Sequence, residues 1–90
     1  ERGGDWGLIW KCVDDPGLRK EVMAAAKKFA AGPPLSMAAI KAQFDAAWTA
    51  GISETLEREA VDQAAAFQTL DLREGATAFV EKRAPKFTGR

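Results

Sequence analysis

The 90-residue chain has no histidine and a single cysteine, Cys12. Without histidine there is no imidazole to act as a base, and one cysteine can form neither an internal disulfide nor a thiolate metal cluster. An excess of charge is also missing, because 13 basic and 13 acidic residues cancel. We therefore expect no metal site and no bulk attraction to nucleic acid.

Long apolar runs are absent as well. No span reaches the roughly 18 apolar residues that a membrane helix needs, and no signal-peptide pattern opens the chain. These absences predict a cytoplasmic protein without membrane contact. Cys12 lies in a short apolar run and is expected to be a small buried hydrophobe. A domain of this length buries only about 60 to 65% of its unfolded surface, so we expect it to need a partner.

The sequence pattern predicts a mainly α chain. Leu8 to Val13 reads as a short strand remnant after an irregular lead-in over Glu1 to Asp5. Four helices follow, from Pro16 to Ala31, from a Ser36 cap to Gly51, from a Ser53 cap to about Thr69, and from Asp71 to Pro85. In the last helix we expect Asp71 to be the N-cap and Glu74 to reach back to its N–H.

Two carboxylate pairs are candidates for acid/base chemistry, Asp14 with Asp15 and Glu57 with Glu59. Neighbours on a turn and residues two apart on a helix point in different directions, so neither pair predicts a dyad. We assign no catalytic residue. Surface pairs four residues apart are predicted instead, namely Glu54 with Arg58 and Glu59 with Gln63.

The second predicted helix carries an apolar stripe formed by Met37, Ile40, Phe44 and either Ala47 or Trp48. This stripe either faces partner subunits or belongs to a private four-helix core. The pattern leaves both alternatives open.

The last helix brings an aromatic ring and two cations to one face. Phe79, Lys82 and Arg83 are spaced by three and four residues, and Lys86 follows the helix. Such a face suits a flat, phosphate-bearing ligand. The alternative is a basic last turn that complements the helix dipole. Gly75, inside the helix, is either simply tolerated or marks the close approach of a backbone or a ligand.

Two segments of this region resemble the C-terminal signature of the enoyl-CoA hydratase/isomerase (crotonase) superfamily. They are Asp71-Leu72-Arg73-Glu74-Gly75 and Ala78-Phe79-Val80-Glu81-Lys82-Arg83-Ala84-Pro85-Lys86-Phe87-Thr88-Gly89-Arg90. Upstream matches are Gly7-Leu8-Ile9, Val13-Asp14-Asp15, Lys41 after Gly32-Pro33, and Glu59. The resemblance covers nearly all of residues 6 to 90. One departure is Leu72, where many members have an aromatic residue.

The resemblance implies that the chain is the C-terminal helical segment of a crotonase-type fold. Residues 1–15 would be the lead-in and strand remnant, and residues 16–90 the segment for oligomerisation and coenzyme A contact. The parent protein would hydrate or isomerise an acyl-CoA through a thioester enolate, as a homotrimer or hexamer, with the coenzyme A thioester as substrate and no covalently bound cofactor. The segment alone is expected to be inactive, because the oxyanion-hole donors and acidic residues of the family precede it.

The resemblance also assigns the binding residues. In the family, the Ala-Phe-x-x-Lys unit lies near the adenine and 3′-phosphate end of coenzyme A, often bound by a neighbouring subunit. The unit here is Ala78 to Lys82, so Phe79 and Lys82 are the predicted coenzyme A contacts.

Within the superfamily, three segments look most like the ring-1,2-epoxyphenylacetyl-CoA isomerases of phenylacetate degradation. They are Trp6-Gly7-Leu8-Ile9-Trp10, Asp14-Asp15 and Lys86-Phe87-Thr88-Gly89. An enoyl-CoA hydratase of fatty-acid oxidation is the first alternative. A second is a non-enzymatic helical module that binds a protein partner through Trp6, Trp10 and Trp48.

Overall fold

The computed structural model describes residues 1–90 and consists of helices without strands. The helices are α1 (Arg2–Asp5), α2 (Asp15–Ala30), α3 (Pro34–Ala46), α4 (Ile52–Phe67) and α5 (Leu70–Glu81). The predicted mainly α fold is confirmed, with the short α1 added at the start. None of the helices has the length and apolar character needed to cross a bilayer.

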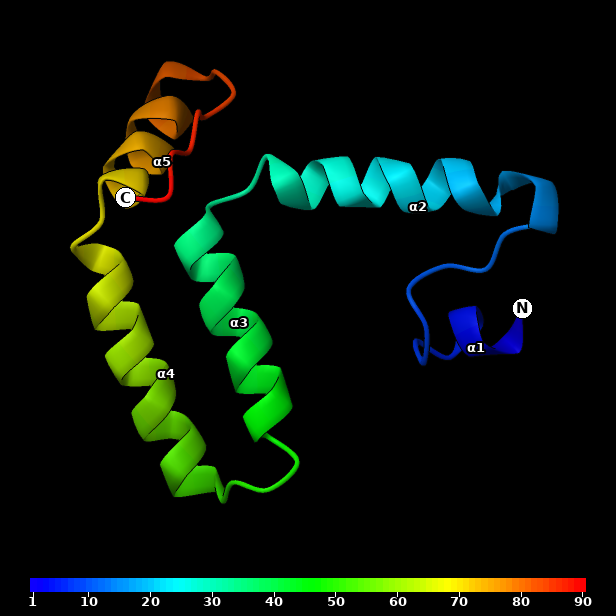
Figure 1. Ribbon diagram of the computed structural model, residues 1–90, viewed down its shortest axis with the longest axis horizontal. Coiled ribbons are helices and arrows are strands. Elements are labelled where there is room, and N and C mark those ends of the chain that lie inside the picture. Colours follow the sequence, from blue (N-terminus) through cyan, green and yellow to red (C-terminus); the bar gives the residue numbers. More distant parts are fainter.

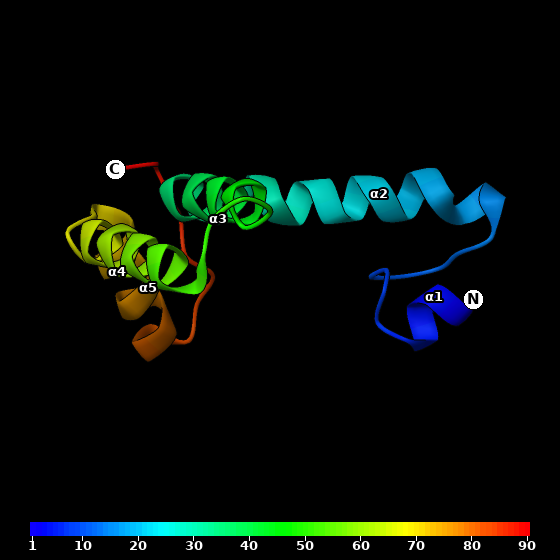
Figure 2. The same ribbon diagram turned by 90° about the horizontal axis from the view of Figure 1, so that it is seen from below.

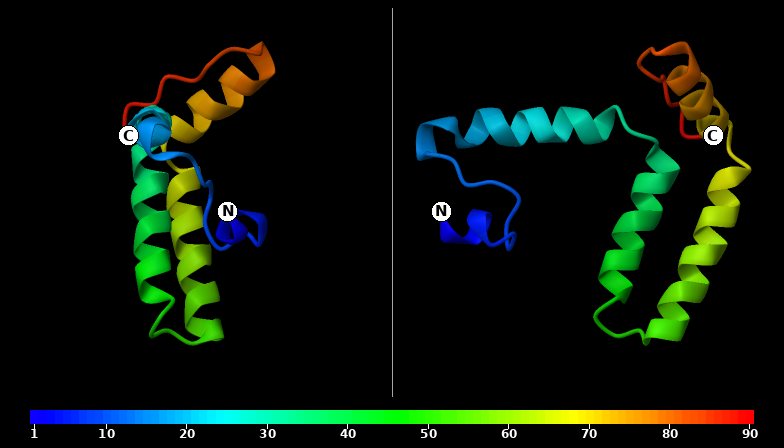
Figure 3. Two further views of the ribbon diagram at one scale, coloured as in Figure 1. Left: turned by 90° about the vertical axis from the view of Figure 1, so that its right-hand side faces the viewer. Right: turned by 180° about the vertical axis from the view of Figure 1, so that it is seen from behind.

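The helices spread over a flat, open shape. α3 and α4 form an antiparallel hairpin and lie side by side in Figures 1 and 3. α2 extends from the start of α3 as a separate arm, and α1 lies near its far end (Figure 1). α5 follows α4, and the last residues fold back along it. Figure 2 shows the thin edge of the molecule, whose extents are 42 × 39 × 19 Å.

This shape leaves the chain almost without a core. The radius of gyration is 16.4 Å, whereas a compact domain of this length has about 12 Å. The accessible surface is 7961 Å², against about 5,100 Å² for a compact protein of this mass. Only Asp71 and Ala78 are buried. The alternative of a private four-helix core is therefore wrong.

The apolar stripe of α3 is open in this chain. Ile40 is 49% exposed and Phe44 is 72% exposed. Trp48 lies beyond the end of α3, in the turn before α4, and is 91% exposed. These side chains are available to another surface, because large exposed apolar side chains grouped along one helix and the turn after it are unusual in a protein that stands alone.

The helices begin earlier than predicted. α2 begins at Asp15, one residue before the predicted Pro16, and the predicted caps Ser36, Ser53 and Asp71 all lie inside helices. The N-cap residues are Asp14, Pro33, Gly51 and Thr69. Proline explains the first two starts, because its φ is already helical and a first-turn residue needs no N–H donor. Ends also differ: α3 stops at Ala46 rather than Gly51, and α5 at Glu81 rather than Pro85.

Residues 8–13 form neither the predicted strand nor a buried run. The chain contains no second strand to complete a ladder, so the segment is an irregular connection. Cys12 is exposed, which corrects the expectation that it is buried. The connection is tied to α2 by an ion pair between Lys11 Nζ and Glu21 Oε2 at 3.0 Å.

The open architecture predicts how the isolated chain behaves. We expect it to associate or to remain partly unfolded at micromolar concentration, because its apolar helix faces have no cover of their own. Size-exclusion chromatography with light scattering, together with tryptophan emission, measures this. A stable monomer in which Trp6, Trp10 and Trp48 all emit as buried residues would contradict the expectation.

Candidate functional site

Asp71 binds the end of the chain and does not cap its own helix. Thr69 is the cap, and its hydroxyl accepts the N–H of Leu72 at 3.2 Å. The Asp71 carboxylate accepts the backbone N–H groups of Thr88 and Gly89, each at 2.8 Å. The backbone N–H of Asp71 donates to the carbonyl of Arg90 at 2.9 Å. A buried carboxylate with these partners has its hydrogen bonds satisfied. It holds residues 82–90, which follow α5 and are called the tail below, against the first turn of α5.

Glu74 makes the second contact between α5 and the tail. Its carboxylate accepts hydrogen bonds from Nη1 and Nη2 of Arg83, at 2.5 and 3.2 Å, and from the backbone N–H of Lys86 at 3.0 Å. The bidentate Arg83 hydrogen bonds, followed by the Lys86 N–H, lower the pKa of Glu74 to about 2. The same contact raises the pKa of Arg83 further. The predicted capping box of Asp71 and Glu74 is therefore wrong, and both carboxylates bind the tail.

The two predicted coenzyme A contacts lie at the end of α5. Phe79 is 85% exposed and packs into no core of this chain. Lys82 has φ 55° and ψ 43°, the left-handed conformation that usually belongs to glycine at a helix end. Its N–H donates to the carbonyl of Phe79, and the N–H of Arg83 to that of Ala78. These two bonds close the helix, at a cost of about 1 kcal/mol for a residue with a Cβ.

The cations of the predicted binding face differ in their partners. Arg83 is engaged by Glu74 and by Glu81, whose Oε2 lies 2.6 Å from Nε. No acidic side chain lies within ion-pair distance of Lys82 or Lys86. The prediction that Arg83 shares the ligand face is therefore not supported, since all three of its nitrogen atoms donate to Glu74, Glu81 or the carbonyl of Ala84. The charge of Lys82 is available.

Gly75 faces the tail. The ring of Phe87 lies beside it, 3.6 Å from where a Cβ would stand, which is an ordinary contact distance. Phe87 and Gly75 also line a hollow of about 170 Å³ together with residues from the start of α3 and the start of α5. The close neighbour of Gly75 is thus a side chain of the tail, and an alanine would fit there without strain.

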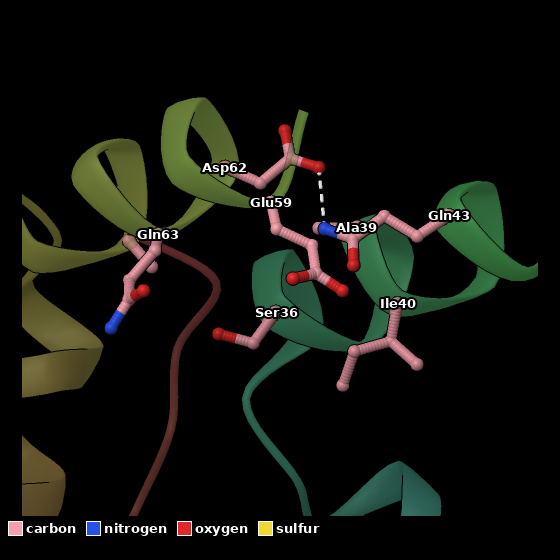
Figure 4. A pocket seen from close by; sticks show the side chains of 8 residues that line it. Ser36, Ala39, Ile40, Gln43, Glu59, Asp62 and Gln63 are labelled. Carbon is pink, nitrogen blue, oxygen red and sulfur yellow. Dashed lines mark hydrogen bonds between the residues drawn. The ribbon is translucent and has the colours of Figure 1, made fainter. Parts of the chain in front are cut away.

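A separate hollow of about 270 Å³ lies between α3 and α4 (Figure 4). Gln43 Nε2 donates to Oδ2 of Asp62 at 2.7 Å across it. Glu59 and Gln63 also line it but do not bond to each other, and Arg58 pairs with Asp62 at 3.8 Å instead of with Glu54. Both predicted surface pairs are therefore wrong. The hollow contains neither Phe79 nor Lys82, and no group of three or more ligand side chains forms a metal cluster in the chain.

Sequence reasoning found the two exposed residues but missed the contacts between α5 and the tail. Asp71 and Glu74 were singled out, yet for a local role at the helix start. Their partners are 9 to 18 residues away along the chain. Local spacing rules for helices do not reach that far. The available signal for these contacts was Pro85, which cannot continue the helix and allows the chain to reverse, together with Arg83, which can pair with an acid of the helix.

The family model for enoyl-CoA hydratase/isomerase matches residues 3–90 of the chain. The chain belongs to this family. The resemblance found in residues 71–90 is thereby confirmed, and the helices are a segment of a crotonase-type fold.

Individual family members resemble the chain over its whole length. It is 36% identical over 90 residues to 1,2-epoxyphenylacetyl-CoA isomerase of Escherichia coli (strain K12), and covers 34% of that protein. It is 40% identical over 90 residues to a probable enoyl-CoA hydratase of Rhodobacter capsulatus, and covers 35% of it. The crystal structure of an enoyl-CoA hydratase from Polaromonas sp. JS666 superposes with a TM-score of 0.87 at 26% identity, over 97% of this chain and 34% of that one. The chain spans about a third of the length of these relatives.

The buried carboxylate of Asp71 generates a stability prediction. In Asp71→Asn one acceptor becomes an NH₂ group that faces a backbone N–H donor. We expect a loss of about 1 to 3 kcal/mol of local stability. Amide hydrogen exchange of the peptide containing Thr88 and Gly89, followed by mass spectrometry on the intact family protein, measures it. The matched control is Asp45→Asn on the exposed face of α3, which should leave the exchange unchanged. Equal protection in the two variants would contradict the assignment.

Glu74 generates a pH prediction. Its pKa is lowered in the folded state from 4.5 to about 2, so the stability it contributes is present above pH 4.5. That stability is lost as the pH falls from 4.5 towards 2, because the carboxylate becomes protonated and releases the tail. A carboxyl titration by NMR measures the pKa. In Arg83→Gln the Glu74 pKa should rise towards its ordinary value. A Glu74 that titrates identically with and without Arg83 would exclude the guanidinium as the cause.

Proposed function

We propose that the chain is the C-terminal helical segment of an acyl-CoA hydratase or isomerase and forms one wall of its coenzyme A site. The observation that carries this proposal is the pair of free groups at the end of α5. Phe79 is exposed and Lys82 has a cation without an acidic partner. An aromatic face offers contact area to adenine, and an ammonium offers charge to the 3′-phosphate.

The same segment is proposed to contribute contacts between subunits in a homotrimer or hexamer. Ile40, Phe44 and Trp48 of the stripe support this because they are exposed, whereas Met37 is half-buried within the chain. The site would then include groups from two subunits.

Thioester enolate chemistry is assigned to other parts of the parent enzyme. It needs hydrogen-bond donors directed at the developing oxyanion and a carboxyl group near the transferred proton. Asp71 and Glu74 bind the tail, Asp62 binds Arg58 and Gln43, and Glu59 lines the hollow between α3 and α4. We therefore infer that the segment alone does not turn over substrate.

The finer proposal for the parent is isomerisation of ring-1,2-epoxyphenylacetyl-CoA in a soluble, cytoplasmic enzyme of phenylacetate catabolism. The 36% identical relative of that name supports it. The alternative is an enoyl-CoA hydratase, and the 40% identical relative named as a probable hydratase supports that. A helical module that ignores coenzyme A is the remaining alternative.

Calorimetry of the intact parent with coenzyme A tests the binding role. Phe79→Ala and Lys82→Ala should each weaken binding by about three- to thirtyfold, since one loses ring contact and the other loses charge. The control is Phe29→Ala on α2, which removes a ring of the same size that is also exposed. Unchanged affinity in both α5 variants would remove the coenzyme A proposal and favour the interaction module.

A further inference from the structure

Lys82 lies between two residues that bond to each other. On one side is Glu81, the last residue of α5, and on the other is Arg83. The Nε of Arg83 donates to Oε2 of Glu81 at 2.6 Å. The backbone on both sides of Lys82 is therefore held by a side-chain bond that spans it.

A second contact holds the same arginine to the middle of α5. Nη1 and Nη2 of Arg83 both reach the carboxylate of Glu74. One oxygen of Glu74 also accepts the N–H of Lys86, which fixes the chain on the far side of Arg83. A guanidinium with a bidentate partner has little rotational freedom, so Arg83 acts as a rigid brace between the helix and the tail.

The brace matters because Lys82 has a left-handed backbone conformation, which is unfavourable for a residue with a Cβ. At φ 55° and ψ 43° its side chain leaves the helix in a direction that a continued right-handed turn would not give. Without the brace the backbone at this residue can relax, and the direction in which the lysine side chain leaves the backbone changes, which moves the region that the ammonium can reach. The attraction between two charges falls as their separation grows, so a displaced ammonium contributes less to a fixed phosphate.

We propose that Glu74 and Arg83 are positioning residues that fix the direction of the Lys82 side chain, and that they thereby set the preference of the parent enzyme for ligands carrying the 3′-phosphate of coenzyme A. This inference rests on the proposed function. Arg83 does not itself bind the phosphate, because its donors are directed at Glu74 and Glu81.

The readout is the ratio of two affinities measured by calorimetry on the intact parent enzyme, with coenzyme A and 3′-dephospho-coenzyme A as probes. In the unmodified enzyme coenzyme A should bind about tenfold more tightly. Glu74→Gln keeps the shape of the side chain and should lower this ratio about three- to fivefold, while the affinity for the dephospho probe stays unchanged. Arg83→Lys keeps the charge but loses the fork, and should act in the same direction.

Lys82→Ala and a double variant separate the inference from the proposed function. Lys82→Ala should bring the ratio close to one. Adding Glu74→Gln to it should lower the ratio no further, because the brace then has no cation to place. The control is Glu54→Gln, an exposed acid in the first turn of α4 without an ion pair, which should leave the ratio unchanged.

Each remaining outcome has a definite meaning. A ratio that falls in Lys82→Ala but not in Glu74→Gln or Arg83→Lys overturns the positioning role and leaves the proposed function standing. Equal weakening for both probes in the Glu74 and Arg83 variants also overturns it, because a general loss of structure does not distinguish the phosphate. An unchanged ratio in Lys82→Ala defeats the proposed function itself. If Glu74→Gln does not fold, Arg83→Lys decides.

Discussion

The chain cannot bury its apolar side chains against one another, and this constraint governs the structure. α2 extends as a free arm, and α3 packs along α4 on one side only (Figure 1). The α3 side chains Phe44 and Ile40 stay accessible. Hydrophobic burial is the main favourable term in folding, so these helices gain little of that stabilisation within the chain. Family membership agrees with this, since the matched relatives are about three times as long.

Within this open frame, order at the end of α5 comes from polar contacts. Asp71 holds the last residues through backbone groups, while Glu74 holds Arg83 and Lys86. Charge-assisted hydrogen bonds are directional, which apolar burial is not. They define the path of the tail in a region with very little core, and the only two buried residues of the chain lie on this helix.

The sequence was sufficient to predict four of the helices. Proline and glycine placed most helix boundaries within a few residues, while the coenzyme A contacts Phe79 and Lys82 stay a prediction from the motif of residues 78–82. It was insufficient for the roles of Asp71 and Arg83. Asp71 fits the pattern of a cap, but Thr69 occupies that position, and Arg83 fits a ligand face, but carboxylates of α5 engage it. Contacts that depend on a chain reversal are not encoded in helical spacing. The expected strand failed for a similar reason, because pairing needs a second strand that these residues do not supply.

The way Asp71 binds the tail affects which sequence changes the tail can accept. Its carboxylate contacts the main-chain N–H groups of residues 88 and 89, and its own N–H contacts the carbonyl of residue 90. The Thr88 hydroxyl adds only a long hydrogen bond to Asp71 Oδ1, at 3.4 Å, and the contact with residue 90 involves its backbone alone. Proline is excluded at residues 88 and 89, since it has no N–H to donate. Gly89 has φ +80°, so glycine is favoured there by backbone conformation. Residues 88–90 are thus constrained by backbone geometry much more than by amino-acid identity.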